Sequence, residues 1–356
     1  MSELTIVIPS FNGLHLLKIC LKSIYNQTYS AFEIVLVDNG SGDGTVAWVG
    51  GHYPDVKIVR FSVNKGFGAA VNEGIRRSSG RYVFLLNNDT ELDPRCLERL
   101  VQTADGNGAY ASFAPKMIRY SDRNMLDGVG DGVFRGGGGY RLGNREPDGM
   151  LWERPMHVFG ACAGAALYRR SFFEKTGLFD EDFFAYLEDV DINFRAVRLG
   201  LRCLSVPIAR VDHMGSQTSG SRLNTFTVSQ TTHNMIRVVV HNYPLSILLR
   251  QWPVIVLQHL GWMVLMLLSR HFSAYLKGIR SALRSFPAML KKRGQWNTRK
   301  TISDSHFWKL VASSEMDVMV CVQRRRALQG KSAGWVRLYM NIFHSDAIEK
   351  KIGQVE

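Results

Sequence analysis

The chain has 356 residues, 46% of them hydrophobic and 21% charged, which allows one large folded domain or two moderate ones. Its net charge is +13, but 18 Lys and Arg against 6 Asp and Glu lie from residue 241 onward, so the first 240 residues are almost neutral. This distribution argues against a uniformly basic nucleic-acid-binding protein and predicts a neutral body with a basic tail.

Targeting and redox signals are sparse. The start, MSELTIVIPSFNG, lacks the basic and long apolar regions of a signal peptide, so none is expected. The five cysteines are scattered without a CxxC pair, which is typical of reduced thiols in a cytosolic protein.

The first hundred residues alternate between short apolar runs and segments with helical spacing. Strands are expected at 4–9, 32–37, 56–62 and 82–86, and helices at 14–27, 43–53 and 68–78. Such alternation predicts βαβ units, a largely parallel sheet and a nucleotide-binding type of α/β architecture.

The segment 121–155 is long, polar and rich in glycine, as in GVGDGVFRGGGGYRLG. Two interpretations are open: a disordered insertion, or a lid over a substrate. After it, Leu187, Val190, Phe194 and Val197 have the spacing of one helix face.

Polar residues follow several expected strands. Asn87, Asn88 and Asp89 come directly after the apolar run 82–86, where ligands bind in open α/β sheets. Asp38 ends the run 32–37 and could accept a hydrogen bond from a ribose hydroxyl or a base. His213 follows the apolar stretch 204–211; a lone histidine is more often structural, but with Asp89 it would suit a divalent cation.

A cluster of acids follows an aromatic stretch. Glu188, Asp189 and Asp191 come just after Phe183, Phe184 and Tyr186. One interpretation is the ordinary preference of carboxylates for a helix N-terminus. The other is a general base whose pKa is raised because the aromatic side chains exclude water.

Other phosphate-binding and nucleophile motifs are weak or missing. Gly66 and Gly68 precede a helix and could cradle a phosphate, but GFG does not fit GxGxxG. The sequence has neither a Walker A motif nor G-x-S-x-G.

Together and in this order, the motifs TIVIPSFNG, VDNGSGDGT, NKGFGAAVNEG, LLNNDTEL, FAYLEDVD and DHMGSQTSG resemble the inverting glycosyltransferases of family two. The resemblance covers roughly residues 4–220 and is strongest to rhamnosyltransferase-like enzymes of bacterial polysaccharide assembly. It implies a GT-A fold, a nucleotide-sugar-binding mixed sheet flanked by helices, and a dTDP- or UDP-linked donor.

The resemblance also implies residue roles. Glu188 and Asp189 match the ED motif, whose Asp is the general base. Asp89 and His213 match the ligands of Mg²⁺ or Mn²⁺, with Asn87 standing where the metal-binding DXD motif has its first Asp; weak metal binding without nucleotide is therefore expected. The nucleotide-sugar site would comprise Pro9, Phe11 and Asn12 by the base, Asp38, then Asn64, Gly66 and Phe67, with Asn87 and Asn88.

The C-terminal third adds a basic amphipathic region. Trp252 to Leu268 is strongly apolar but marginal for a span, and the following residues mix Lys and Arg with Phe, Tyr and Leu. This pattern favours a helix lying in the interface of an anionic membrane over a buried core helix. The expected domains are 1–240, catalytic, with halves meeting near residue 110, and 241–356, a basic helical extension.

The function expected is transfer of a sugar, with rhamnose preferred, to a hydroxyl of a lipid-linked or polysaccharide acceptor. The enzyme would be peripheral on the cytoplasmic face of the inner membrane; it would not bind nucleic acid and could form an oligomer. Two alternatives stay open: a nucleotidyltransferase that makes a nucleotide sugar, and a non-catalytic membrane-docking module with a transferase fold.

Overall fold

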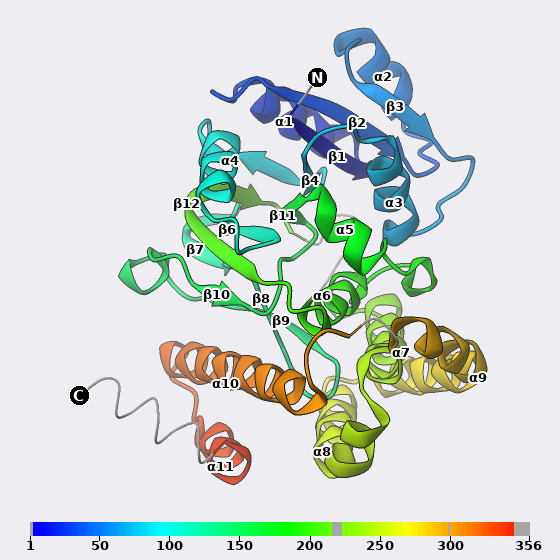
Figure 1. Cartoon of the computed structure of the whole chain (residues 1–356), viewed down its shortest axis with the longest axis vertical. Coiled ribbons are helices and arrows are strands. Elements are labelled where there is room, and N and C mark those ends of the chain that lie inside the picture. The colour runs from blue at the N-terminus through cyan, green and yellow to red at the C-terminus, as the bar shows by residue number, and fades with distance from the viewer. Residues whose placement is uncertain (1–2, 216–222, 298–299, 345–356) are drawn as a thin grey trace.

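The structure, a computed structural model, describes residues 3–215, 223–297 and 300–344. Its centre is a mixed sheet of ten described strands in the order β10-β12-β6-β11-β4-β1-β2-β3, with β5 beside β12 and β7 beside β6 (Figure 1). Their bounds are β1 Leu4–Ser10, β2 Phe32–Asp38, β3 Lys57–Arg60, β4 Tyr82–Leu86, β5 Thr90–Leu92, β6 Ser112–Arg119, β7 Asp122–Gly128, β10 His157–Val158, β11 Ala165–Arg169 and β12 Cys203–His213.

Helices cover both faces of this sheet, which confirms the predicted α/β architecture. The side chains of β4 alternate between two apolar cores: Val83 and Leu85 face one, while Tyr82, Phe84 and Leu86 face the other. The helices of this part are α1 Leu14–Tyr25, α2 Thr45–His52, α3 Phe67–Arg77, α4 Cys96–Gly106, α5 Arg170–Thr176 and α6 Glu188–Arg198, with the 3-10 turns η1 Met150–Trp152 and η2 Glu181–Phe183.

Strand direction brings the polar strand ends to one edge of the sheet. β1, β2 and β4 are mutually parallel. Because β11 is antiparallel to both β4 and β6, β6 runs in the direction of β4, and so does β12, the parallel neighbour of β6. Asp38, Asn87 and His213 therefore follow or end strands at the same edge, as ligand sites in α/β sheets do.

The glycine-rich segment is neither a disordered insertion nor a simple lid. It forms β7, then the hairpin of β8 Asp131–Val133 and β9 Gly139–Arg141, and most of residues 126–139 are buried. Its glycines allow close packing: a Cβ on Gly132 would lie 2.5 Å from Val318, and one on Gly139 would lie 2.6 Å from Val190. The prediction failed because packing glycines and loop glycines look alike in a sequence.

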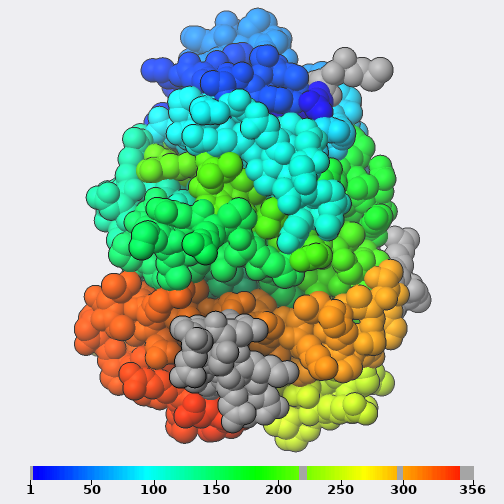
Figure 2. All heavy atoms as spheres, turned by 60° about the vertical axis from the view of Figure 1, so that its left-hand side comes forward, coloured from blue at the N-terminus to red at the C-terminus, as the bar shows by residue number. Residues whose placement is uncertain are grey.

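In the described part of the chain, five helices follow the sheet: α7 Thr225–Asn242, α8 Leu245–Leu268, α9 Phe272–Asn297, α10 Asp304–Leu328 and α11 Gly334–Phe343. They gather at the end of the molecule opposite β1–β3 (Figures 1 and 2). The predicted boundary at 240/241 falls in the last turn of α7, and residues 345–356 of the predicted extension lie outside the described residues.

The helical region shares a core with the sheet. Met316, Val318 and Met319 of α10 belong to the same buried cluster as Val83 of β4 and Tyr168 of β11. The division into two domains stays a prediction, but α10 packs as an integral layer over the β8–β9 hairpin rather than as a loose tail.

A buried ion pair joins the two regions. Glu315 of α10 pairs with Arg135 of the hairpin turn, and both side chains are almost completely buried. Glu315 also accepts hydrogen bonds from the Arg135 N–H at 2.9 Å, from the Tyr339 hydroxyl at 3.1 Å and from Gln258 of α8, and contacts His344 Nε2 at 3.0 Å. One carboxylate thus holds α8, α10 and α11 against the hairpin.

Replacing Glu315 with Gln should therefore lower the free energy of unfolding by about 3–5 kcal/mol, because Arg135 would be left buried without its counter-charge. Chemical denaturation of the full-length chain measures this change. Glu73→Gln, which removes the surface pair with Arg77, serves as the control and should cost less than about 1 kcal/mol. Equal effects of the two changes would contradict this account of Glu315.

Candidate active site

Strand register places Asp89 beside His213. β5 pairs antiparallel with β12 so that Thr90 lies opposite His213, and the Met214 N–H donates to the Asp89 carbonyl at 2.9 Å. The Asp89 Oδ2 to His213 Nε2 distance is 3.5 Å, and both side chains are buried. The predicted pair therefore comes together.

His213 has a second carboxylate on its other nitrogen. Asp127 of β7, which the sequence analysis missed, lies with Oδ2 2.7 Å from His213 Nδ1. Burial alone would lower the pKa of His213, but Asp127 and Asp89 outweigh it and raise that pKa above its ordinary value.

The predicted general base lies on the first turn of α6. Glu188 is buried, whereas Asp189 is partly exposed and is the carboxylate that can meet a substrate. Burial raises the pKa of Asp189, although N–H groups of Ala163 and Val190 and the charge of Arg141 oppose the rise. Burial and the neighbouring Asp189 charge raise the pKa of Glu188 as well. Desolvation thus acts in the predicted direction.

Two further groups lie beside the base. Ligand atoms of Asp131, at the start of β8, Cys162 and Asp189 all lie within 4.8 Å of one another. Burial, with the charge of Asp189 next, raises the pKa of Asp131 well above its ordinary value. Asp131 and Asp127 stand four residues apart in LDGVGDGV, and that spacing in a glycine-rich stretch was the signal that could have revealed them.

Arg141 of β9 links the two halves of the site. Its guanidinium contacts Asp127 and lies 3.5 Å from His213 Nδ1. Burial opposes its charge, but Cys162 and the carboxylates of Asp127, Asp131 and Asp189 raise its pKa, so it remains a cation. The side of Asp89 and His213 and the side of Asp189 therefore share one fixed positive charge.

The turn before the base is held in an unusual backbone conformation. Phe184, Tyr186 and Leu187 have φ values of 58°, 69° and 67°, a left-handed region that costs free energy in residues with side chains. Asn234 of α7 donates to the carbonyls of Phe183, Ala185 and Tyr186 at 3.1, 2.9 and 2.7 Å. One amide group of the helical region therefore fixes the turn that precedes Glu188.

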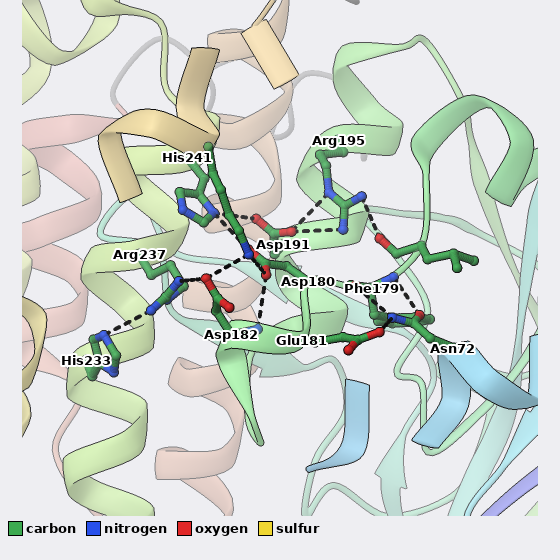
Figure 3. Close-up of polar contacts among 12 residues, drawn as sticks. Asn72, Phe179, Asp180, Glu181, Asp182, Asp191, Arg195, His233, Arg237 and His241 are labelled. Carbon is green, nitrogen blue, oxygen red and sulfur yellow. Dashed lines mark hydrogen bonds and ion pairs between the residues drawn. The ribbon is translucent and has the colours of Figure 1, made fainter. Parts of the chain in front are cut away.

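Ion pairs fix the residues on either side of that turn (Figure 3). Arg237 of α7 donates to Asp182 at 3.2 Å, and Lys292 of α9 contacts Asp180 at 2.5 Å and Asp182 at 2.7 Å. Asp191, grouped with the acids in the sequence, instead faces inward and pairs with Arg195 at 2.9 Å. Asp191 is thus a structural residue of α6.

The predicted nucleotide-side residues gather around the ends of β1 and β2. The Asn12 N–H donates to Ser41 Oγ at 3.0 Å, and Asn39 Nδ2 donates to Asn64 Oδ1 at 3.0 Å. Pro9, next to last in β1, lies opposite Val37, and Phe11 directly follows the strand and is partly exposed. Asp38 is fully buried and accepts from the Ser41 N–H, so its expected contact with a base or ribose stays a prediction.

The remaining predicted residues border the same region. Gly66 caps α3 with φ 89°, and a Cβ there would lie 2.4 Å from the Phe184 carbonyl, which accepts from the Phe67 N–H at 2.6 Å. Asn88 Nδ2 donates to Ser10 Oγ at 3.0 Å, and Asn87 is partly exposed. The residues predicted to bind the nucleotide sugar are therefore in direct contact, at the start of α3, with the turn that precedes the general base.

Comparison with known proteins places these features in a family. Residues 5–177 match the Glycosyl transferase family 2 profile. The chain is 30% identical over 229 residues to the N-acetylglucosaminyl-diphospho-decaprenol L-rhamnosyltransferase of Mycobacterium tuberculosis, covering 56% of this chain and 72% of that protein. The chain belongs to glycosyl transferase family 2.

Two further similarities agree with this assignment. A PGL/p-HBAD biosynthesis glycosyltransferase of Mycobacterium bovis is 28% identical over 264 residues, covering 71% of this chain and 91% of that protein. The solved structure of GalNAc-T7 with UDP, GalNAc and Mn²⁺ has a TM-score of 0.55 and 19% identity, and the match covers 67% of this chain and 47% of that one. The predicted GT-A type of mixed sheet is thereby confirmed for this glycosyltransferase.

The residues at Asp89 fit a divalent cation. Asp89 Oδ1 is buried and has no hydrogen-bond partner among the described residues. The 3.5 Å between His213 Nε2 and Asp89 Oδ2 is close to the separation of about 3 Å expected for two ligands at right angles around Mg²⁺. The Asp89 carboxylate suits Mg²⁺ and Mn²⁺, whereas an imidazole such as that of His213 is a ligand more typical of transition metals.

Replacing Asp189 with Asn should abolish sugar transfer while leaving nucleotide binding intact, because only the proton acceptor is lost. Because the pKa of Asp189 is raised in the folded state, the folded protein is more stable with this carboxyl group protonated. That stability is lost as pH rises through the folded-state pKa. The melting temperature of D189N relative to wild type should therefore increase with pH. Turnover assays, and melting curves from below the ordinary Asp pKa of 3.8 upward, measure both, and near-wild-type turnover would refute the base assignment.

Proposed function

We propose that this glycosyltransferase moves a sugar from a nucleoside-diphosphate donor to an acceptor hydroxyl with inversion at the anomeric carbon. The observation that carries the proposal is the division of the site: Asp89 and His213 on one side, Asp189 on the other, and Arg141 between them. A single carboxylate base on one side and an anion-stabilising site on the other match what a one-step displacement needs.

The residues of the chain divide the reaction between them. The Asp189 carboxylate accepts the proton of the acceptor hydroxyl as its oxygen forms a bond to the anomeric carbon. The bond from that carbon to the diphosphate oxygen breaks on the opposite face, so the configuration inverts. A bound Mg²⁺ or Mn²⁺ would offset the negative charge of the departing nucleoside diphosphate.

The names of the relatives guide the substrate proposal. The Mycobacterium tuberculosis relative is named for transfer of L-rhamnose to a decaprenol-linked acceptor. We infer for this chain a dTDP- or UDP-linked donor, preferably of rhamnose, and a polyprenyl-diphosphate-linked acceptor used in cell-surface glycan assembly.

A panel of dTDP- and UDP-linked rhamnose, galactofuranose, glucose and N-acetylglucosamine tests this proposal, with a polyprenyl-diphospho-N-acetylglucosamine acceptor and Mg²⁺ or Mn²⁺. The expected result is release of nucleoside diphosphate with one donor, most rapidly with dTDP-rhamnose, and an NMR spectrum showing inverted anomeric configuration. Release of pyrophosphate from a nucleoside triphosphate would instead indicate a nucleotidyltransferase. No turnover with any donor would indicate a non-catalytic module.

A large apolar surface supports the proposed membrane association. Among the described residues, α8 is the helix long and apolar enough to cross a membrane, and only 17% of its apolar window is buried. The large apolar side chains exposed along it are Leu245, Leu249, Trp252, Val256, Leu257, Leu260, Val264, Leu265, Leu267 and Leu268. Lys277, Arg280 and Arg284 on α9 are exposed nearby in the chain. An exposed apolar surface of this extent, with basic neighbours, suits an anionic membrane.

The packing of α8 favours lying on the membrane over crossing it. Gln258, in the middle of the helix, contacts the Gly136 N–H of the hairpin turn and donates to the Tyr339 hydroxyl at 2.6 Å. Trp262 Nε1 donates to Thr232 of α7 at 2.9 Å. A helix packed at its midpoint on the catalytic body keeps one face there, so the opposite face is the one available to lipid. We therefore infer a peripheral enzyme, placed on the cytoplasmic side of the inner membrane.

Replacing both Leu249 and Trp252 with Asp should weaken binding to vesicles of anionic phospholipid more than tenfold, because each buried apolar side chain contributes about 1.5–3 kcal/mol. Vesicle co-sedimentation measures the change. Val63→Asp, an equally exposed apolar site near the opposite end, is the matched control and should bind as wild type does. Unchanged vesicle binding of the double variant would rule out α8 as the membrane-facing surface.

A further inference from the structure

Asp127 reaches His213 because of an irregularity in β7. In the pairing of β6 with β7, Met117 lies opposite Gly128 and Ile118 lies opposite Leu126, so Asp127 is left as an extra, unpaired residue. Such a bulge redirects a side chain away from the regular alternation of a strand. It directs the Asp127 carboxylate toward His213, which ends β12 on the other side of β6.

Several described residues hold the Asp127 carboxylate in place. Asn144 Nδ2 donates to the Asp127 carbonyl at 2.8 Å and to its Oδ1 at 3.3 Å. Arg141 contacts Oδ2, the same oxygen that faces His213 Nδ1. Asp127, Asn144 and His213 are all buried. A buried carboxylate held by two donors has little freedom to turn away from the imidazole.

This contact determines which nitrogen of His213 is available to a ligand. When Nδ1–H donates to a carboxylate, Nε2 carries the lone pair, and Nε2 faces Asp89. A carboxylate on the distal nitrogen also raises the basicity of a metal-binding histidine, and removing such a partner typically weakens metal affinity by about 10–100-fold.

We propose that Asp127 is a positioning residue, which holds His213 in the Nδ1–H tautomer with Nε2 directed at a divalent cation shared with Asp89. Arg141 and Asn144 keep the Asp127 carboxylate in place and Arg141 balances its charge. The inference rests on the proposed use of a cation by this enzyme. It adds Asp127 and Asn144, both buried, to the site and gives Arg141 a second role as the partner of Asp127.

The first experiment measures Mn²⁺ binding by EPR, from the loss of the free-ion signal, with UDP or dTDP present and without acceptor. Asp127→Asn should bind Mn²⁺ about 10–100-fold more weakly than wild type. Asp148→Asn is the matched control: it removes a carboxylate from the same segment, paired with Lys116 of β6 at 2.7 Å, and should leave Mn²⁺ affinity unchanged. Melting curves and nucleotide binding without metal verify that each variant is folded.

Two outcomes of this titration have different meanings. If His213→Ala and Asp89→Asn both bind Mn²⁺ as wild type does, the cation site of the proposed function is wrong. If those two variants lose affinity but Asp127→Asn retains it, the cation site stands and the positioning role of Asp127 is overturned.

The second experiment needs no variant and so does not depend on folding of the Asp127 substitution. Nitrogen-15 NMR of histidine-labelled wild-type protein with Mg²⁺ and nucleotide should show His213 protonated at Nδ1 and unprotonated at Nε2. His213→Ala identifies the resonance. Protonation at Nε2 with a bare Nδ1 would overturn the proposal, since Asp127 would then not be accepting the proton of Nδ1.

Discussion

The guanidinium of Arg141 lies among the carboxylates of Asp127, Asp131 and Asp189, and the arrangement of the site depends on this contact. Carboxylates brought together in a cleft with little water raise one another's pKa, and a base that holds its proton cannot accept another. A fixed cation opposes that rise at Asp189 and pairs with Asp127. Since Arg141 is on β9, the hairpin has to lie close beneath the carboxyl edge of the main sheet.

The position of the β8–β9 hairpin determines how α6 and α10 can pack. The hairpin fits between α6 and α10 only because Gly132 and Gly139 carry no side chain. Its outer side is closed by α10, and the buried pair of Arg135 with Glu315 fastens it there. The basic C-terminal region, separable from the catalytic part by charge alone, is therefore joined to it physically. A change in α10 would reach Arg141 through direct packing contacts.

The sequence predicts those features of the fold and the site that are determined by residues close together in the chain. The strands and helices from β1 to β4 were predictable because elements such as β4 and α1 carry their periodicity within a few residues. The meeting of Asp89 with His213 was predictable too, since both follow apolar runs that end at one sheet edge. The placement of Asp127 and Arg141 beside His213 was not, because the bulge in β7 and the register of the hairpin arise from pairing between distant segments.

The turn at residues 184–187, just before Glu188 and Asp189, also depends on the helical region. Three residues in left-handed conformation before Glu188 persist only because their surroundings hold them, and the donors that do so belong to α7. Lys292, which holds Asp180, is on α9, the helix that also presents Leu283 and Phe286 to the exterior. The helix that holds Asp180 thus also forms part of the surface proposed to meet lipid. If an acceptor is anchored in that membrane, the base stands at a set distance from it, because the same helices determine both positions.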